Sequence, residues 1–328
     1  MFRAPLLATL RRPCRRLAWL LIAAQLLLAG SATLAEERVA VLLSEGGGFH
    51  REFVEALQRA LDDPSISGRS LSLVELTDLP ERADDPRLGG ASLLVAVGVR
   101  AMRAAAERSD LPPTLNVLVP RSSYERVLAE SARRRPRAQF SVIYLDQPLS
   151  RQLALIRKLF PGKPRVGVLL GPESSAFLPR LRAEEARGGP GVVSEKVLSE
   201  PEIIPALARV LRDVDLLLAL PDSVVFTRDS ARPILLTAYR HGKPLLGFSQ
   251  AYVKAGALAA VFSTPAQIAR QTAEILDSSL ARRSVLPAAS YPRYFSVSVN
   301  RAVARGLAIE APADEALRAA LAVGPDGE

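Results

Sequence analysis

Polar and charged side chains that could hold a small molecule occur directly after short apolar runs of the sequence. Ser44, Glu45 and Gly46 follow the run 39–43, and Arg100 lies close behind the run 93–97. If such runs are strands of a doubly wound sheet, these loops lie at the carboxyl ends of the strands, where sheets of this kind bind ligands. The predicted ligand-binding residues are Ser44, Glu45, Gly46, Arg100, Ser122, Tyr124, Tyr144, Ser174, Asp222, Ser223, Ser249 and Tyr252.

The polar members of this set have a second interpretation. Asp222 and Ser223 could receive an amine and a hydroxyl of a ligand, or they could cap the turn that follows them. Ser174, after the run 166–170, has the same two interpretations. Arg100 could hold a carboxylate through two hydrogen bonds, or it could be an exposed helix residue. The residue types alone leave both interpretations open.

The aromatic members and the glycine-rich loop are also compatible with two roles. Tyr124, Tyr144 and Tyr252 fall near predicted strand ends, where they could line a small-ligand cleft or pack in the core. The three glycines at 46–48 could let a ligand approach the backbone, or could simply form a turn. They match neither the dinucleotide-binding nor the phosphate-loop spacing, so no nucleotide cofactor is expected.

No arrangement of residues in the sequence indicates an enzyme. The nucleophile-elbow, zinc-protease and calcium-loop patterns do not occur. The two histidines, His50 and His241, are far apart, and His50 is interpreted as an exposed or capping residue. The single cysteine, Cys14, lies near the N-terminus, which excludes disulfides and thiolate metal sites from the rest of the chain. We therefore expect neither catalysis, nor a bound metal, nor a cofactor.

Apolar runs alternate with helical patterns along the chain, and this alternation must position the loops. The predicted strands are 39–43, 93–97, 115–119, 140–145, 166–170, 192–198, 216–220 and 245–248. Continuous apolar strands separated by helices indicate parallel sheets covered on both faces. The pattern restarts near Pro148, which indicates two such domains. Thr264, Pro265 and Gln267 also predict a capped helix start.

The first 35 residues read as an export signal. They contain five arginines and no acidic residue, and an apolar run of about 13 residues at 17–29 precedes small residues and Ala35. That run is shorter than the roughly 20 residues that span a bilayer. Without this segment, the net charge falls from +9 to +4, which does not favour nucleic-acid binding. We expect a cleavable signal peptide at 1–35 and a periplasmic protein.

Four segments resemble the ABC transporter substrate-binding protein family of the type I periplasmic fold. They are 219–225, 248–259, 263–274 and 291–300. The resemblance implies an α/β fold of two doubly wound parallel-sheet lobes joined by a three-segment hinge. It also implies crossovers near 144–148, 261–266 and 288–296.

The same resemblance implies domain limits, a function and partners. Lobe 1 would comprise 36–146 plus 264–290, and lobe 2 would comprise 147–263 plus 291–328. The protein would capture an amino-acid-like or carboxylate-bearing molecule between the lobes and present it, as a monomer, to an inner-membrane ABC permease. The alternative is a periplasmic accessory or sensor protein that contacts an envelope protein instead. Val99 and Arg100, which replace a short hydroxyl residue of the family, favour that alternative.

Overall fold

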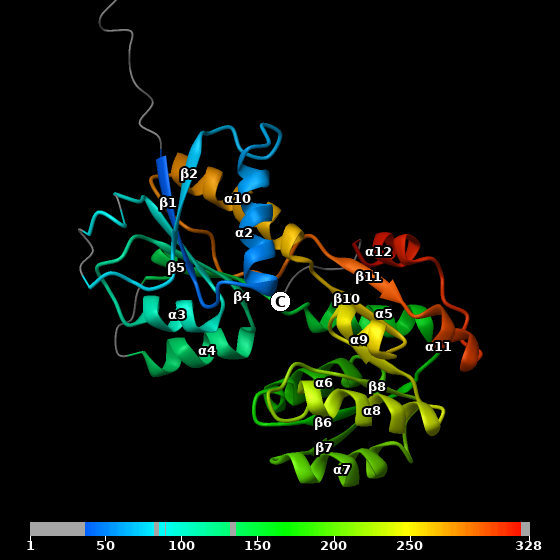
Figure 1. The fold of residues 1–328 in the computed structure, drawn as a ribbon. Coiled ribbons are helices and arrows are strands. Elements are labelled where there is room, and N and C mark those ends of the chain that lie inside the picture. The colour runs from blue at the N-terminus through cyan, green and yellow to red at the C-terminus, as the bar shows by residue number, and fades with distance from the viewer. Residues whose placement is uncertain (1–36, 82–84, 89, 132–135, 323–328) are drawn as a thin grey trace, which may run out of the picture. The chain divides into compact units, whose positions relative to one another are not determined.

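The computed structural model describes residues 37–81, 85–88, 90–131 and 136–322, which form two β-sheets with helices on both faces (Figure 1). The predicted signal peptide lies outside the described residues. In spatial order, the first sheet contains β2 (Leu71–Leu76), β1 (Glu37–Leu43), β3 (Leu93–Val97), β4 (Thr114–Val119) and β5 (Phe140–Tyr144). The second contains β11 (Ser296–Val299), β10 (Ala259–Phe262), β9 (Leu245–Gly247), β8 (Leu216–Leu218), β6 (Arg165–Leu170) and β7 (Gly191–Lys196).

The first sheet is parallel throughout, and both of its faces are buried. On one face Val39 and Val41 pack with α2 (Gly48–Leu61) and α10 (Pro265–Ala281). On the other face Ala40 and Leu42 pack with α3 (Val99–Ala106) and α4 (Arg121–Glu130). Successive strand residues point to opposite faces, so a strand covered on both sides needs an unbroken apolar run.

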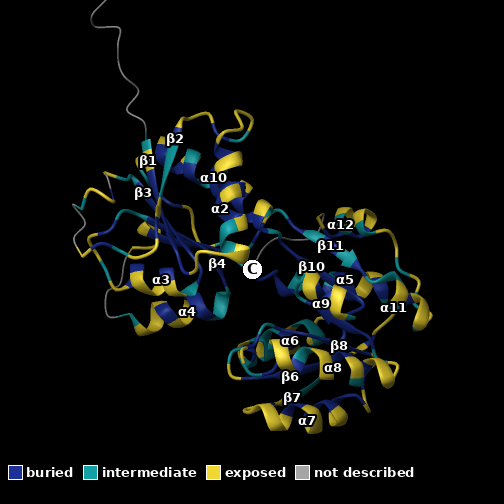
Figure 2. Ribbon diagram, in the orientation of Figure 1, coloured by how far each residue is buried: buried dark blue, intermediate teal, exposed yellow. Residues whose placement is uncertain are grey.

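The second sheet is covered in the same way. Helices α5 (Leu149–Leu159), α6 (Leu178–Ala186), α11 (Arg301–Gly306) and α12 (Asp314–Ala322) pack in one apolar cluster of this sheet. Helices α7 (Ile203–Val210), α8 (Arg228–Arg240) and α9 (Gln250–Ala255) pack in the other. Figure 2 shows the result, with buried strands between helices whose outer sides are exposed.

Helix α10 returns the chain from the second sheet to the first. It follows β10 of the second sheet but packs beside α2 on the first. Its start is the capping box predicted at Thr264, where the threonine hydroxyl accepts from Gln267 N and Gln267 Oε1 accepts from Thr264 N.

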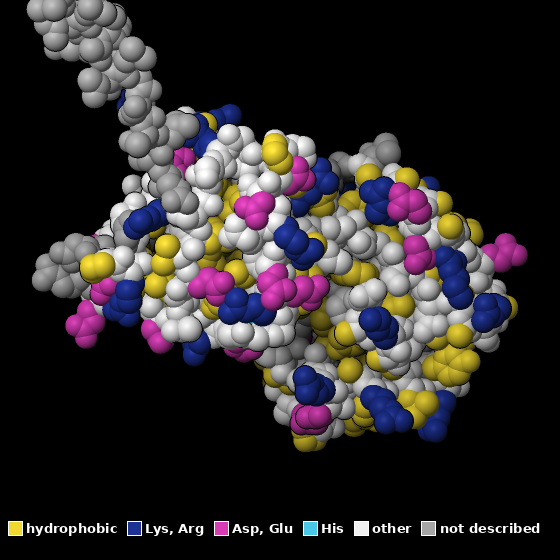
Figure 3. Space-filling model, turned by 45° about the horizontal axis from the view of Figure 1, so that its top comes forward, with side chains coloured by type: hydrophobic (Ala, Val, Ile, Leu, Met, Phe, Trp, Pro, Cys, Tyr) yellow, Lys and Arg dark blue, Asp and Glu magenta, His cyan; other side chains and the backbone are white. Residues whose placement is uncertain are grey.

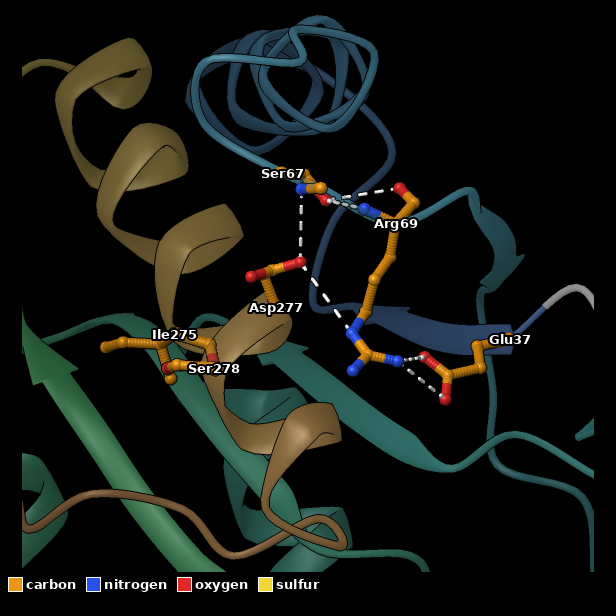
Figure 4. A network of polar contacts seen from close by, with 7 residues as sticks. Glu37, Ser67, Arg69, Ile275, Asp277 and Ser278 are labelled. Atoms are coloured by element: carbon orange, nitrogen blue, oxygen red, sulfur yellow. Dashed lines mark hydrogen bonds and ion pairs between the residues drawn. The ribbon is translucent and has the colours of Figure 1, made fainter. Parts of the chain in front are cut away.

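Polar contacts fix the far end of α10 to the first sheet (Figure 4). The Asp277 carboxylate accepts a hydrogen bond from Gly68 N at 3.2 Å and lies 3.8 Å from Arg69 Nε. Arg69 also pairs with Glu37 of β1 at 3.3 Å. These exposed ion pairs contribute little individually, but they tie three distant segments of the chain to one another.

Charged side chains of both signs are interspersed over the face of the molecule shown in Figure 3. Many of them form exposed ion pairs, such as Arg51 with Glu75 and Arg209 with Glu195. Within the described residues, no helix has the length and apolar character needed to cross a membrane.

The predicted fold class is confirmed, with three strands that the sequence did not reveal, β2, β10 and β11. Of these, β10 lies inside the second sheet but is only four residues long. Both sheets are doubly wound and mostly parallel, but β11 pairs antiparallel with β10 at an edge. The prediction also missed β2, the other edge strand next to β1. Edge strands are exposed on part of their surface, and β11 accordingly alternates serine with valine instead of forming an apolar run.

Candidate functional site: the carboxyl ends of the two sheets

The first sheet changes direction between β1 and β3, and its predicted polar residues lie at this point. The chain leaves β1 for β2 on one side, whereas β3 lies on the other side, so the loops after β1 and β3 diverge. Ser44 holds them in register, since its N–H donates to Val97 O and its hydroxyl accepts from Ala101 N, both at 2.9 Å. The Ser44 hydroxyl thereby satisfies an amide in the first turn of α3.

Gly98 allows this close approach of the two loops. Its φ of +87° lies in a region that residues with a side chain rarely adopt. A Cβ at this position would lie 2.6 Å from His50 Nε2 and 2.7 Å from Ser44 Oγ. His50 is thus part of the site, with its Nδ1 4.0 Å from the Glu45 carboxylate.

The other predicted residues of this loop pair are accessible. Glu45, Gly46 and Arg100 are exposed, and the neighbouring Phe49 is 44% exposed. The Arg100 guanidinium donates to the Ser44 carbonyl, which holds the cation beside the loop after β1. The site thus presents a cation, a carboxylate and an aromatic ring to solvent.

The second sheet changes direction between β6 and β8, where Ser174 and Asp222 lie. One oxygen of the Asp222 carboxylate accepts from Glu173 N, Ser174 N and the Ser174 hydroxyl at 2.8–3.0 Å. Its other oxygen accepts from Val224 N and Val225 N. Asp222 is therefore a buried residue that ties together the loops after β6 and β8.

Ser223 lies beside Asp222 but has a different environment. Its side chain is exposed, and its backbone N–H donates to the Glu173 carboxylate at 3.1 Å. Glu173 also pairs with Arg126 of α4 at 3.4 Å. Among the three predicted residues of this group, Ser223 is the one that offers an accessible hydroxyl.

Ser122 and Tyr124 lie in the first turn of α4, which follows β4, and Tyr144 is the last residue of β5. Tyr124 is buried, its hydroxyl donates to Phe140 O, and burial raises the pKa of its phenol to about 12. Its ring meets that of Tyr144 at 6.0 Å between centroids. Tyr144 in turn packs against Tyr291 at 5.1 Å. Tyr124 thus packs in the core, while Tyr144 reaches toward the chain segment that holds Tyr291.

Ser249 and Tyr252 lie together at the start of α9. The Ser249 hydroxyl caps the helix by accepting from Tyr252 N. The Tyr252 hydroxyl donates to Phe226 O at 3.2 Å, and its ring packs against Phe248 and Phe226. Burial raises the pKa of the Tyr252 phenol to about 12.

Buried polar contacts join the segments that connect the two sheets. The Gln147 side chain, between β5 and α5, donates to the Ser263 hydroxyl at 2.9 Å, and Ser263 donates to Tyr294 O. Arg151 donates to Gln147 Oε1 and to Pro292 O. One network therefore includes residues from all three connecting segments.

Asp146 lies beside this network and is buried. It accepts a hydrogen bond from Arg121 N at the start of α4. Burial raises the pKa of its carboxyl to about 6, although the contact with the Arg121 amide opposes the shift.

The structure thus gathers the predicted residues into four groups. The groups are Ser44 with Glu45, Gly46 and Arg100; Ser174 with Asp222 and Ser223; Ser122 with Tyr124 and Tyr144; and Ser249 with Tyr252. Sequence reasoning gave no site role to His50, Arg121 or Tyr291. The sequence feature that could have indicated His50 is its position in the first turn of α2, directly after the loop that follows β1.

Among the described residues, no group of three or more His, Cys, Asp or Glu side chains is arranged to hold a metal ion.

No protein-family model matches the sequence, and no curated protein is significantly similar to it. Solved structures, however, match over most of the chain. The ligand-free, open structure of a substrate-binding protein with adhesive properties from Clostridium difficile is 16% identical, with a TM-score of 0.68, covering 85% of this chain and 97% of that one.

Two further structures match with a TM-score of 0.58. An ABC domain from Streptococcus pneumoniae in complex with L-Trp is 16% identical and covers 87% of this chain and 98% of its own. A conserved domain protein from Vibrio cholerae is 18% identical and covers 86% of this chain and 97% of its own. The fold is the type I substrate-binding fold, as the resemblance implied.

Proposed function

We propose that this protein captures a small amino-acid-like or carboxylate-bearing solute between two lobes and presents it to an ABC-type permease. The observation that carries the proposal is that each sheet has a direction change whose loops hold polar residues, Ser44 and Arg100 in one and Ser174 and Ser223 in the other. The substrate-binding proteins among the structural neighbours support it, as does the absence of any enzyme motif from the sequence.

The lobes that we propose are 36–146 plus 264–290, and 147–263 plus 291–328. The packing of α10 on the first sheet and of α12 with α5 of the second supports this division. The connecting segments meet at Gln147, Ser263 and Tyr294, and small dihedral changes there would swing one lobe against the other. A solute that contacts both lobes shifts the population toward the closed arrangement.

The solute class follows from the groups that the loops present. Arg100 can receive a carboxylate, while Glu45 and Glu173 can receive an amine. The L-Trp bound to the pneumococcal neighbour supports an amino-acid-like solute. We further propose that residues 1–35 direct export to the periplasm, and that the protein acts there as a monomer without a cofactor.

A second candidate function is that of an accessory or sensor protein which contacts an envelope partner and delivers no solute. One observation favours it: Asp222 and Ser174 are engaged in hydrogen bonds with each other and with neighbouring loop amides. The Arg100 guanidinium likewise contacts the Ser44 carbonyl.

A thermal-shift screen separates the two functions. The full gene is expressed with its own N-terminus, and the exported product is purified and melted with a library of amino acids and organic acids. A solute at a hundred times its Kd stabilises the fold by about 2.7 kcal/mol, which raises the Tm by about 5 °C. If no solute raises the Tm, the solute-capture proposal is wrong and the accessory function is favoured.

A further inference from the structure

The outer side of α8 carries cations and large apolar side chains together. Arg228, Arg232, Leu236, Tyr239 and Arg240 are exposed, and we call these five residues the α8 face. Positions 228, 232, 236 and 240 are four residues apart, so their side chains follow one another along one side of the helix. Figure 2 shows exposed residues along this outer side of α8. Leu236 and Tyr239 are each 46% exposed.

The stability of the helix does not account for two of these cations. Arg228 is the first residue of α8, where the positive end of the helix dipole repels a cation. Arg228 and Arg232 are also four residues apart, and like charges at this spacing destabilise a helix. A side chain without charge at either position would serve the fold at least as well. The two cations therefore indicate a contact outside the chain.

Ion pairs do not account for the cations either. Within the part of the chain that the structure describes, Arg228, Arg232 and Arg240 form no ion pair. By contrast, arginines of α4, α6 and α10 pair with a glutamate three or four residues away in the same helix. The only acidic residue of α8 is Asp229. The α8 face therefore has an excess of positive charge.

The neighbouring helices extend this positive charge. Helix α9 packs in the same apolar cluster as α8, and its Lys254 is exposed. The end of α11 lies against α8, because a Cβ at Gly306 would lie 2.7 Å from the Tyr239 hydroxyl oxygen. Arg305, the residue before Gly306, is exposed as well. Neither Lys254 nor Arg305 forms an ion pair among the described residues. The positive surface thus includes residues of three helices.

An anionic phospholipid surface matches both properties of the α8 face. Its negative headgroups attract Lys and Arg side chains. Leucine can enter the boundary between headgroups and acyl chains, and tyrosine rings are enriched at the level of the headgroups. Arginine can keep its charged end among the headgroups while its apolar stem covers neighbouring apolar surface. An acidic protein segment matches the charge, but its carboxylates offer no apolar partner to Leu236 and Tyr239.

We propose that the α8 face, with Lys254 and Arg305 beside it, docks on a membrane surface that contains anionic phospholipids. The cations contact the headgroup phosphates, and Leu236 and Tyr239 enter the boundary below them. This inference goes beyond solute capture and does not depend on it, since the α8 face includes none of the strand-end residues assigned to the solute.

The test measures sedimentation of the exported protein with lipid vesicles. The vesicles contain equal parts of phosphatidylcholine and phosphatidylglycerol, and vesicles of phosphatidylcholine alone are the neutral control. The double variant Arg228→Gln, Arg232→Gln removes two cations of the α8 face. Its matched control is Arg157→Gln, Lys158→Gln, which removes the same charge from exposed positions of α5. Helix α5 packs in the other apolar cluster of the second sheet and exposes no large apolar side chain.

We expect the wild type and the α5 variant to bind the mixed vesicles and to leave the neutral vesicles unbound. The α8 variant should bind the mixed vesicles about 25-fold more weakly, because each cation near an anionic membrane strengthens binding about fivefold. Its Tm should not fall, since the substitutions remove a repulsion, and an unchanged Tm separates lost binding from a lost fold. Raising the salt from about 0.1 M to 1 M should release the wild type from the vesicles.

Three results overturn the inference: no binding by the wild type, equal binding by all three proteins, or an equal loss in both double variants. A further variant, Leu236→Ser, separates a membrane from an acidic protein as the partner. We expect this variant to bind the mixed vesicles more weakly than the wild type. If it binds them equally, and the wild type binds soluble polyglutamate as tightly as vesicles, the face is a site for acidic protein and the proposal is wrong. The thermal-shift screen tests solute capture separately, so either proposal can fail alone.

Discussion

At the scale of single residues, two polar residues that are neighbours in the sequence have different roles. Asp222 is buried under five hydrogen bonds, whereas Ser223 is exposed. The sequence left capping and ligand binding open for both, because both residue types favour either role. The difference depends on which loop donors converge on the side chain, and three of the five around Asp222 come from Glu173 and Ser174, about fifty residues earlier in the chain.

Replacement of Asp222 by alanine should be strongly destabilising. It would leave the amides of Glu173, Ser174, Val224 and Val225 without their acceptor, at a cost of about 3–5 kcal/mol in the free energy of unfolding. Ser223→Ala is the matched control and should change that free energy by less than about 0.5 kcal/mol. Urea denaturation measures both, and equal effects would contradict the structural role of Asp222.

Asp146 should make stability depend on pH in the direction opposite to most carboxylates. Its pKa is raised to about 6 in the folded protein, against about 3.9 in an unfolded chain. As the pH rises from 4 to 6, the unfolded state therefore releases its proton first, and the folded state loses about 2–3 kcal/mol of relative stability.

The Asp146→Asn variant isolates this effect. Other carboxylates of the protein have lowered pKa values, such as Glu185 and Glu202, and they make the total stability rise with pH. The quantity to measure is consequently the stability of the variant minus that of the wild type, at pH values from 4 to 7. We expect this difference to grow with pH, and a constant difference would contradict a raised Asp146 pKa.

At the scale of elements, the sequence predicts most of the strands that are covered on both faces, though not the four-residue β10, and it predicts the capped start of α10 at Thr264. The apolar runs at β1, β3 and β6 are continuous because both faces of each strand are buried. By contrast, β2 and β11 lie at sheet edges, where fewer buried positions leave a weaker pattern. The pairing of Ser44 with Ala101 could not be predicted, since it depends on the order of the strands in the sheet.

Gly98 should tolerate no side chain. In Gly98→Ala, the new Cβ would clash with His50 and Ser44, and the backbone would be strained at a φ of +87°. We expect a loss of about 2–4 kcal/mol in the free energy of unfolding, and separation of the loops after β1 and β3.

Gly46→Ala provides the control for this variant. A Cβ at Gly46 would meet nothing within 4 Å, and its φ is not positive. This substitution should leave stability within about 0.5 kcal/mol of the wild type. Thermal denaturation of the two variants checks the comparison, and similar losses in both would show that the Gly98 contacts are unimportant.

At the scale of the whole molecule, the alternation of strands and helices predicts two doubly wound sheets, and the restart near Pro148 predicts that they are separate. The sequence does not predict that Arg121, Arg180 and Tyr291 come together, because they lie on three segments far apart in the chain. Residues within one loop are close whatever the fold, but such long-range groups depend on the complete arrangement of the elements.

The central claim is that a solute draws the two lobes together. Small-angle X-ray scattering of the exported protein, with and without a saturating amount of the solute that most raises the Tm, tests it directly. We predict a smaller radius of gyration in the presence of the solute. Unchanged scattering from a wild-type protein that calorimetry shows to be saturated would contradict lobe closure.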